Sequence, residues 1–413
     1  MTGPAMQVAA LARRVPMPAE EDAIRSRWPF HGEDEIAAVG EILRSGRVNT
    51  LVHGDYRRRF EQGFADYIGV PHAIAVANGT LALELALRAL GIGAEDEVIV
   101  SPRSYFASAS AIVAVGAKPV FADIDPVSQN IDPDSIAAMV TARTRAVLCV
   151  HLAGWPCDMD PIRATCDRHG LKLIEDCAQA LGASYHGRKA GSFGDAAAFS
   201  FCTDKIMSTG GEGGMLLLRD AATWERAWSY KDHGKSHAKL TAASAAPDGC
   251  FRWLHEGFGS NYRLTEMQAA IGTLQLAKLP AWLAARQGNA AILDEALGDI
   301  PLLRLARPPA HVRHAYYKYY FFLRGDDDDG AARDAFVREL QKSGVPCGTG
   351  SCPEIYREEA FADSDSRPAR RLPIARMVGN SSVMLPVDPS LSAADMRRIA
   401  ERIIRTCATR SAS

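Results

Sequence analysis

The chain has 413 residues, of which 47% are hydrophobic and 23% charged, a composition that excludes a disordered protein and suffices for a large domain plus a second lobe. The formal net charge of -2 gives no overall field that would gather nucleic acid or an anionic membrane, so we expect neither as a partner. Nine cysteines without a CxxC pair argue against a disulfide framework and a zinc site, so we predict no metal. No run of eighteen apolar residues occurs, which favours a soluble, cytoplasmic protein.

The predicted elements begin with a loose leader over residues 1–28 and an amphipathic helix from Glu33 to Leu43 that closes near Gly46. From residue 73, short β-rich runs alternate with helical ones, which is typical of βα units on a mainly parallel sheet. Helices are expected over Thr80–Leu90 and Tyr105–Val115. The seven expected strands are Ala73–Ala77, Glu97–Val100, Pro119–Phe121, Arg145–Val150, Leu171–Glu175, Ala197–Phe201 and Met215–Leu218. They predict one large α/β domain with a mainly parallel seven-stranded sheet.

Beyond the last strand the pattern is less regular. Residues 229–259 lack periodicity and are long for a connection inside a compact domain, which indicates a functional or mobile loop. Two long helices, Leu264–Leu279 and Trp282–Leu297, are expected to link the large domain to a smaller one. The expected α+β tail consists of a strand over Tyr316–Leu323 and helices over Ala331–Ser343 and Ala393–Cys407.

The chain therefore divides into the leader at 1–28, a large domain at 29–279 and a smaller C-terminal α+β domain at 280–413. The acidic run Asp326–Asp329 is expected to cap or precede a helix rather than to bind calcium, because EF-hand spacing is absent.

A carboxylate and a lysine stand after two of the predicted strands. Asp176 follows the strand Leu171–Glu175, at the edge where open α/β sheets bind ligands. Lys205 leads from a later strand into the glycine cluster Gly210–Gly214. A pyridoxal phosphate site needs both groups, one for the ring nitrogen and one for the aldehyde. Taken singly, each has an ordinary alternative: Asp176 could cap a helix, and Lys205 could be a solvated surface lysine.

Two further segments suit the same ligand. Asn78-Gly79-Thr80 stands between a strand and a helix, so its N–H groups and the Thr80 hydroxyl could hold a phosphate dianion. An ordinary helix cap is the alternative there. The ring of Tyr105 could stack on a flat cofactor, or it could be a core aromatic.

With these motifs the chain resembles the pyridoxal-phosphate sugar aminotransferases of the DegT/StrS type, which have the aspartate-aminotransferase fold, also called PLP fold type I. The resemblance runs from about residue 33 to the C-terminus, and many blocks occur in the family's order. They are residues 78–83, 104–108, 123–125, 151–154, 175–180, 191–195 and 199–201, Lys205 with its glycines, and residues 259–266.

The resemblance implies a role for each site residue. Lys205 looks like the catalytic lysine that bonds to the cofactor aldehyde, Asp176 like the partner of the ring nitrogen and Gln179 like the residue near the ring hydroxyl. Tyr105 matches the stacking aromatic, and Gly79, Thr80 and Ser200 match the phosphate site. Asn261 matches an asparagine that reaches the phosphate in the neighbouring subunit, which implies a homodimer with shared active sites.

The departures from the family pattern are Asn78, Cys177 and Cys202-Thr203-Asp204, and none of them removes a proposed chemical group. The resemblance implies transfer of an amino group from an amino acid, with L-glutamate expected, to a keto-sugar on a nucleoside diphosphate, in amino-sugar or lipopolysaccharide O-antigen biosynthesis. A cyclitol ketone as acceptor and a non-catalytic regulatory protein on this fold are the alternatives. A pyridoxamine-dependent sugar dehydratase is disfavoured, because relatives of that kind carry histidine where Lys205 stands.

Overall fold

A seven-stranded sheet forms the centre of the structure, a computed structural model that describes residues 23–243, 253–325 and 329–411. The strand order is β1-β9-β8-β5-β4-β2-β3, and only β9 runs against the other six. The predicted mainly parallel sheet of seven strands is therefore confirmed. The strands are β1 (His72–Val76), β2 (Glu97–Val100), β3 (Lys118–Phe121), β4 (Thr144–Val150), β5 (Lys172–Asp176), β8 (Ala196–Ser200) and β9 (Gly214–Leu218).

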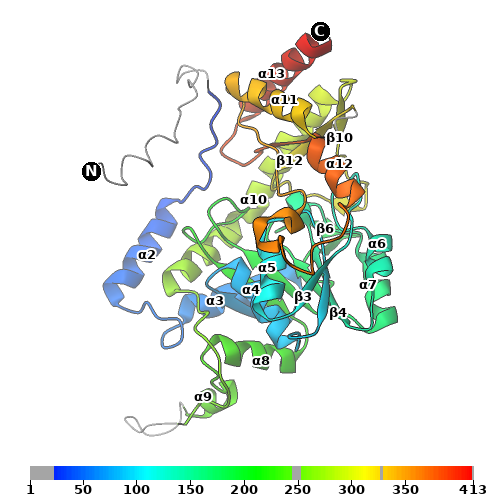
Figure 1. Cartoon of the computed structure of the whole chain (residues 1–413). Coiled ribbons are helices and arrows are strands. Elements are labelled where there is room, and N and C mark those ends of the chain that lie inside the picture. The colour runs from blue at the N-terminus through cyan, green and yellow to red at the C-terminus, as the bar shows by residue number, and fades with distance from the viewer. Residues whose placement is uncertain (1–22, 244–252, 326–328, 412–413) are drawn as a thin grey trace, which may run out of the picture.

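Helices cover both faces of this sheet, because successive side chains of a strand point to opposite faces. In β4, for example, Ala146 and Leu148 pack with α4 and α5, whereas Val147 and Cys149 pack with α7 on the other side. Figure 1 shows the helices on either side of the strands. The surrounding helices are α2 (Glu33–Ser45), α3 (Asp55–Ile68), α4 (Gly79–Ala89), α5 (Ala107–Ala114), α6 (Pro133–Met139), α7 (Met159–His169) and α8 (Ala221–Lys231).

One helix replaces the two that the sequence predicted over 264–279 and 282–297. α10 (Glu266–Leu297) is continuous and contains Pro280 in its interior. It begins with a reciprocal capping box, in which Thr265 and Gln268 bond each other's backbone. Packing against α2 and α3 near one end and against α13 near the other holds the helix together across the proline. The domain boundary expected at 279/280 falls inside this helix.

The C-terminal part is an α+β unit around a three-stranded sheet. The strands follow the order β10-β12-β13, and all pairs are antiparallel. The sequence predicted β12, α11 and α13, but it missed β10, β13 and α12. The elements are β10 (Leu303–Leu305), β12 (Tyr319–Leu323), β13 (Ser382–Leu385), α11 (Ala331–Lys342), α12 (Pro373–Ser381) and α13 (Ala393–Ser411). A small third sheet joins β6 (Ser184–Tyr185), β7 (Arg188–Lys189) and β11 (Val312–Arg313).

Three sequence expectations need correction or lie partly outside the described residues. The leader is not loose over residues 23–28, because Ile24 is buried in the core of the C-terminal unit and its N–H bonds to Gly344 O. The loop expected over 229–259 contains the helix α9 (His237–Ala243), and residues 244–252 lie outside the described part. Of the acidic run, Asp326–Asp328 lie outside it as well, and Asp329 accepts a hydrogen bond from the N–H of Ala331 at the start of α11.

Two glycines in α10 allow a matched test of its packing. A Cβ on Gly272 would lie 2.6 Å from the Phe60 ring, whereas a Cβ on Gly288 would meet nothing within 4 Å. We expect Gly272→Ala to lower the free energy of unfolding by about 1–3 kcal/mol through overpacking. Gly288→Ala should raise it by up to about 1 kcal/mol, because alanine is the better helix former. Chemical denaturation of both variants checks this, and equal effects at the two positions would contradict the packing described.

Candidate active site

The carboxyl ends of β5 and β8 bring the predicted site residues together. Asp176, the last residue of β5, lies opposite Ala198 in the parallel pairing, and β8 ends two residues later at Ser200. Lys205 follows in the turn after β8. The N-terminus of α4 approaches the same point, since a Cβ added to Gly79 would lie 2.7 Å from the Cβ of Ser200.

Asp176 is a buried carboxylate, only 5% exposed. It accepts hydrogen bonds from Ser108 Oγ at 2.7 Å and from the N–H of Ala178 at 3.1 Å, and Ser104 Oγ lies 2.8 Å behind Ser108. No helix follows Asp176, so the alternative of a helix cap is wrong. Burial raises the pKa of Asp176, although the two hydrogen bonds and the charge of Lys205 act in the opposite direction.

This environment fits the ring nitrogen of pyridoxal phosphate. Among the described residues, no cation forms an ion pair with Asp176. A buried carboxylate without a cation is costly, and a protonated ring nitrogen would supply the missing positive charge. The donor set at this point therefore suits the cofactor that the sequence predicted.

Lys205 is enclosed by residues from distant parts of the chain. Its side chain is 16% exposed, so the alternative of a solvated surface lysine is wrong. The Nζ atom lies 3.4 Å from Tyr317 Oη and 3.5 Å from Asp204 Oδ1. The carbonyl of Lys205 accepts a 2.7 Å hydrogen bond from the indole of Trp28. Sequence reasoning missed Tyr317 and Trp28, and its only signal for Tyr317 was a tyrosine-rich strand that began near Tyr316.

The N-terminus of α4 offers a site for the cofactor phosphate. Asn78 Oδ1 accepts the N–H of Leu81 at 2.9 Å, so Asn78 is the helix cap. The N–H groups of Gly79 and Thr80 belong to the first turn, where the helix itself provides no acceptor. Gly79 lies against Ser200, where a side chain on residue 79 would clash. The helix cap predicted as the alternative is present, and it leaves these N–H groups available for the predicted anion.

The remaining predicted residues differ in their surroundings. Gln179 is buried, and its Oε1 accepts the N–H of Ala153 at 2.7 Å. Tyr105 lies just before α5 with 71% of its surface exposed, so it is not the core aromatic of the alternative interpretation. Asn261 is exposed, and its Oδ1 accepts the N–H of Arg263 at 3.3 Å. No described contact joins Tyr105 or Asn261 to Lys205 within one chain.

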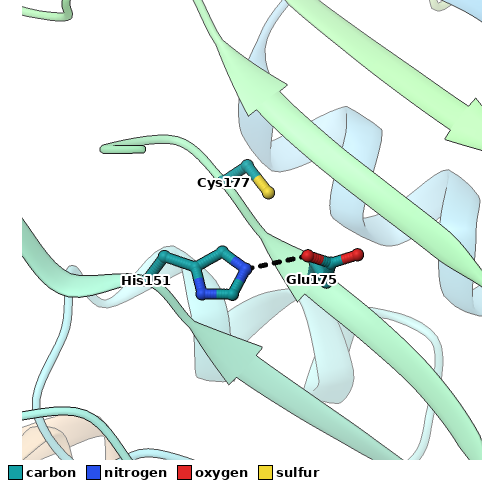
Figure 2. Close-up of side chains that lie close together, drawn as sticks. All are labelled: His151, Glu175 and Cys177. Atoms are coloured by element: carbon teal, nitrogen blue, oxygen red, sulfur yellow. Dashed lines mark hydrogen bonds and ion pairs between the residues drawn. The ribbon is translucent and has the colours of Figure 1, made fainter. Parts of the chain in front are cut away.

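The residue before Asp176 belongs to a second buried polar cluster. Figure 2 shows His151, Glu175 and Cys177, a group whose potential metal ligands lie within 4.8 Å of one another. Both ring nitrogens of His151 already have partners: the N–H of Cys157 donates to His151 Nδ1 at 2.9 Å, and His151 Nε2 donates to Glu175 at 2.9 Å. Glu175 also accepts the N–H groups of residues 191, 193 and 194. We therefore interpret the cluster as a structural network.

The hydrogen bonds decide the charge state of Glu175. Burial alone would raise its pKa, but the bonds from His151 and from the backbone N–H groups outweigh burial and lower it. The Glu175 carboxylate accepts four hydrogen bonds from the protein and needs no ligand. The neighbouring Asp176 carboxylate accepts two hydrogen bonds and forms no ion pair with a described cation.

A mainly parallel sheet with Asp176 and Lys205 at its carboxyl edge is the arrangement of a pyridoxal-phosphate enzyme of fold type I. The family described as DegT/DnrJ/EryC1/StrS aminotransferases matches residues 29–404, and the chain belongs to this family. It is therefore an aminotransferase that uses pyridoxal phosphate. Within the described residues, no helix combines the length and the hydrophobicity that crossing a membrane requires.

Three similar proteins each match most of this chain. An L-glutamine:2-deoxy-scyllo-inosose aminotransferase of Streptomyces fradiae is 41% identical over 77% of this chain and 76% of its own length. A GDP-perosamine synthase of Caulobacter vibrioides is 38% identical over 84% of this chain and 88% of its own. The crystal structure of an aminotransferase from Psychrobacter cryohalolentis superposes with a TM-score of 0.89 at 45% identity, covering 93% of this chain and 99% of that one.

Replacement of the buried carboxylate tests the ring-nitrogen site. We expect Asp176→Asn to weaken the binding of pyridoxal phosphate about 10- to 100-fold, since one charge-assisted contact is lost. Fluorescence titration of the apoprotein measures this affinity, and Asp363→Asn, at an exposed position, is the control. An unchanged affinity in the Asp176 variant would contradict the assignment.

Replacement of Glu175 tests the structural network. Glu175→Gln presents an amide N–H₂ to backbone donors, and we expect it to lower the free energy of unfolding at pH 7 by about 2–4 kcal/mol. Because the folded-state pKa of Glu175 is lowered, its stabilisation is present above the ordinary pKa of about 4.3. This stabilisation is lost as the pH falls through the folded-state pKa. The difference in free energy of unfolding between the variant and the wild type should therefore become smaller in acid. Denaturation at several pH values measures this, with the exposed Glu401→Gln as control.

Proposed function

We propose that this aminotransferase moves the amino group of an amino acid onto the keto group of a nucleotide-activated sugar, with Lys205 as the residue that bonds to the cofactor and transfers the proton. The observation that carries the proposal is the placement of two groups after adjacent parallel strands: the enclosed Lys205 amine follows β8, and the buried carboxylate of Asp176, which forms no ion pair among the described residues, ends β5. The N-terminus of α4 lies at the same edge.

Each residue has a task in this proposal. When bound, pyridoxal phosphate supplies the aldehyde that takes up the amino group and the ring that accepts electrons from the substrate carbon. Asp176 holds a proton on the ring nitrogen, and Gln179 lies near the ring hydroxyl. The N–H groups of Gly79 and Thr80, with the hydroxyls of Thr80 and Ser200, bind the phosphate. Lys205 carries the proton between the two carbon atoms, acting first as base and then as acid.

The acceptor has two candidates. A nucleotide-activated keto-sugar is favoured by the similarity to a protein named GDP-perosamine synthase. A cyclitol ketone is the second candidate, because several similar proteins are named 2-deoxy-scyllo-inosose aminotransferases. We propose L-glutamate as the donor; these names specify L-glutamine, which is therefore the donor to compare with it. An amino-sugar pathway such as lipopolysaccharide O-antigen biosynthesis would use the first kind of acceptor.

We also propose a homodimer in the cytoplasm in which each active site uses residues of both subunits. Five large apolar side chains between Phe30 and Val52, a stretch that includes α2, are exposed, and a second subunit would cover them. Asn261 and Tyr105 are exposed as well, so that a second subunit could reach them. The eight described cysteines are free, as expected in a reducing compartment.

The function is tested by two half-reactions followed through cofactor absorbance. L-Glutamate or L-glutamine should remove the yellow colour of the loaded protein, and the true acceptor should restore it. The acceptor panel contains keto-sugar nucleotides and 2-deoxy-scyllo-inosose. We expect Lys205→Ala to slow both half-reactions by about 10²–10⁴-fold or more, because the proton carrier is lost. A Lys205→Ala protein with wild-type rates would contradict the assignment, as would a wild type that no amino donor decolourises.

A further inference from the structure

Two side chains, Asp204 and Tyr317, meet at the free amine of Lys205. The hydroxyl of Tyr317 donates a hydrogen bond to the carboxylate of Asp204. The Lys205 Nζ atom lies 3.4 Å from the Tyr317 oxygen, 3.5 Å from Asp204 Oδ1 and 4.8 Å from the centroid of the Tyr317 ring. Asp204 stands directly before Lys205, whereas Tyr317 comes from the C-terminal part of the chain. We call Asp204 and Tyr317 the amine clamp.

The tyrosine of the clamp is held in place by its own neighbours. Tyr317 is only 7% exposed. Its carbonyl accepts a hydrogen bond from the guanidinium of Arg286, which stacks on the Trp28 ring at 5.2 Å. The Trp28 indole in turn bonds to the carbonyl of Lys205. The hydroxyl of Tyr317 and the backbone of Lys205 are thereby fixed relative to each other.

The charges of the clamp complement an ammonium ion. Burial alone would raise the pKa of Asp204, but the charge of Lys205 and the hydrogen bond from Tyr317 outweigh it and lower the pKa. Burial and the neighbouring Asp204 raise the pKa of Tyr317, so its hydroxyl keeps the proton that it donates. Lys318 lies on the same ring, 4.9 Å from its centroid, and burial lowers its pKa. The clamp thus carries one negative charge, on Asp204.

We propose that the amine clamp holds the Lys205 amine whenever it is not bonded to the cofactor, and that Asp204 stabilises the ammonium formed when Lys205 takes a proton from the substrate. In that step a substrate C–H bond breaks, its electron pair stays with the substrate and cofactor, and a new N–H bond forms at Nζ. Return of the proton reverses the change. Asp204 and Tyr317 are positioning residues, and their role rests on the proposed function of Lys205.

Two substitutions separate the charge of the clamp from its shape. Asp204→Asn removes the negative charge, and Tyr317→Phe removes the hydroxyl while it keeps the ring. The matched controls are Asp294→Asn and Tyr319→Phe, because Tyr319 donates a 2.8 Å hydrogen bond to Asp294 in the same C-terminal unit without contacting Lys205. The conservative variant Asp204→Glu should restore the behaviour of the wild type.

The first readout is the half-reaction of the loaded enzyme with L-glutamate. We expect Asp204→Asn and Tyr317→Phe to slow it about 3- to 10-fold, because the contacts of the amine are 3.4–3.5 Å long and the Asp204 side chain is 55% exposed, so that solvent screens its charge. The donor concentration for half-maximal rate should change less than about 3-fold, because the clamp acts on the proton transfer and not on binding. The isotope effect with α-deuterated L-glutamate should rise. Both controls should stay within about 2-fold of the wild type.

The second readout does not depend on turnover. Apoprotein is mixed with pyridoxal phosphate, and covalent attachment is followed by absorbance and by mass spectrometry after borohydride reduction. Attachment requires the Nζ atom in the position that the clamp gives it. We therefore expect attachment to slow about 3- to 10-fold in Asp204→Asn and Tyr317→Phe, and to stay within about 2-fold of the wild type in Asp294→Asn, Tyr319→Phe and Asp204→Glu.

The outcomes distinguish the inference from the function on which it rests. If Asp204→Asn and Tyr317→Phe match their controls in both the half-reaction rate and the attachment rate, the proposed amine clamp is wrong. If Lys205→Ala still attaches the cofactor at the wild-type rate, the proposed function of Lys205 is wrong instead. Circular dichroism shows whether each variant is folded. Should Asp204→Asn not fold, the rate and the isotope effect of Tyr317→Phe decide the inference.

Discussion

The parallel pairing of β5 with β8 is the constraint on which the site depends. It places Asp176 opposite Ala198, so that the end of β5 and the turn after β8 lie at one edge of the sheet. Ser200 then meets the N-terminus of α4, and Lys205 enters the same region from the turn. Strand pairing therefore fixes the backbone positions of Asp176 and Ser200, and the turn after β8 then places Lys205.

Two consecutive buried carboxylates on β5 differ in how completely the protein pairs them. Glu175 faces four donors from the protein and needs nothing further. Asp176, on the opposite face of the strand, has two donors and no cation. Since an incompletely paired buried charge is costly, Asp176 is the one that a cationic ring nitrogen can complete. The same argument assigns the His151 cluster to stability (Figure 2).

Distant segments of the chain converge on Lys205. Trp28 comes from the N-terminal stretch, Lys205 from the turn after β8, and Tyr317 from the approach to β12. Arg286 of α10 contacts both Trp28 and Tyr317. The environment of the Lys205 amine therefore depends on how α10 and the C-terminal unit pack next to the large sheet (Figure 1). A substitution that disturbs this packing would change the position of the Lys205 amine through these contacts.

The sequence by itself determined the α/β class, the seven strands of the large sheet and the positions of Asp176 and Lys205 after two of those strands, because strand periodicity and site motifs are local signals. It could not determine the continuity of α10 across Pro280, since packing at both ends outweighs the local preference of proline. Nor could it reveal that Ile24 is buried, or that the Tyr317 hydroxyl lies 3.4 Å from the amine of Lys205, 112 residues away. Contacts between such distant positions carry no periodic signature, so only the tertiary structure decided them.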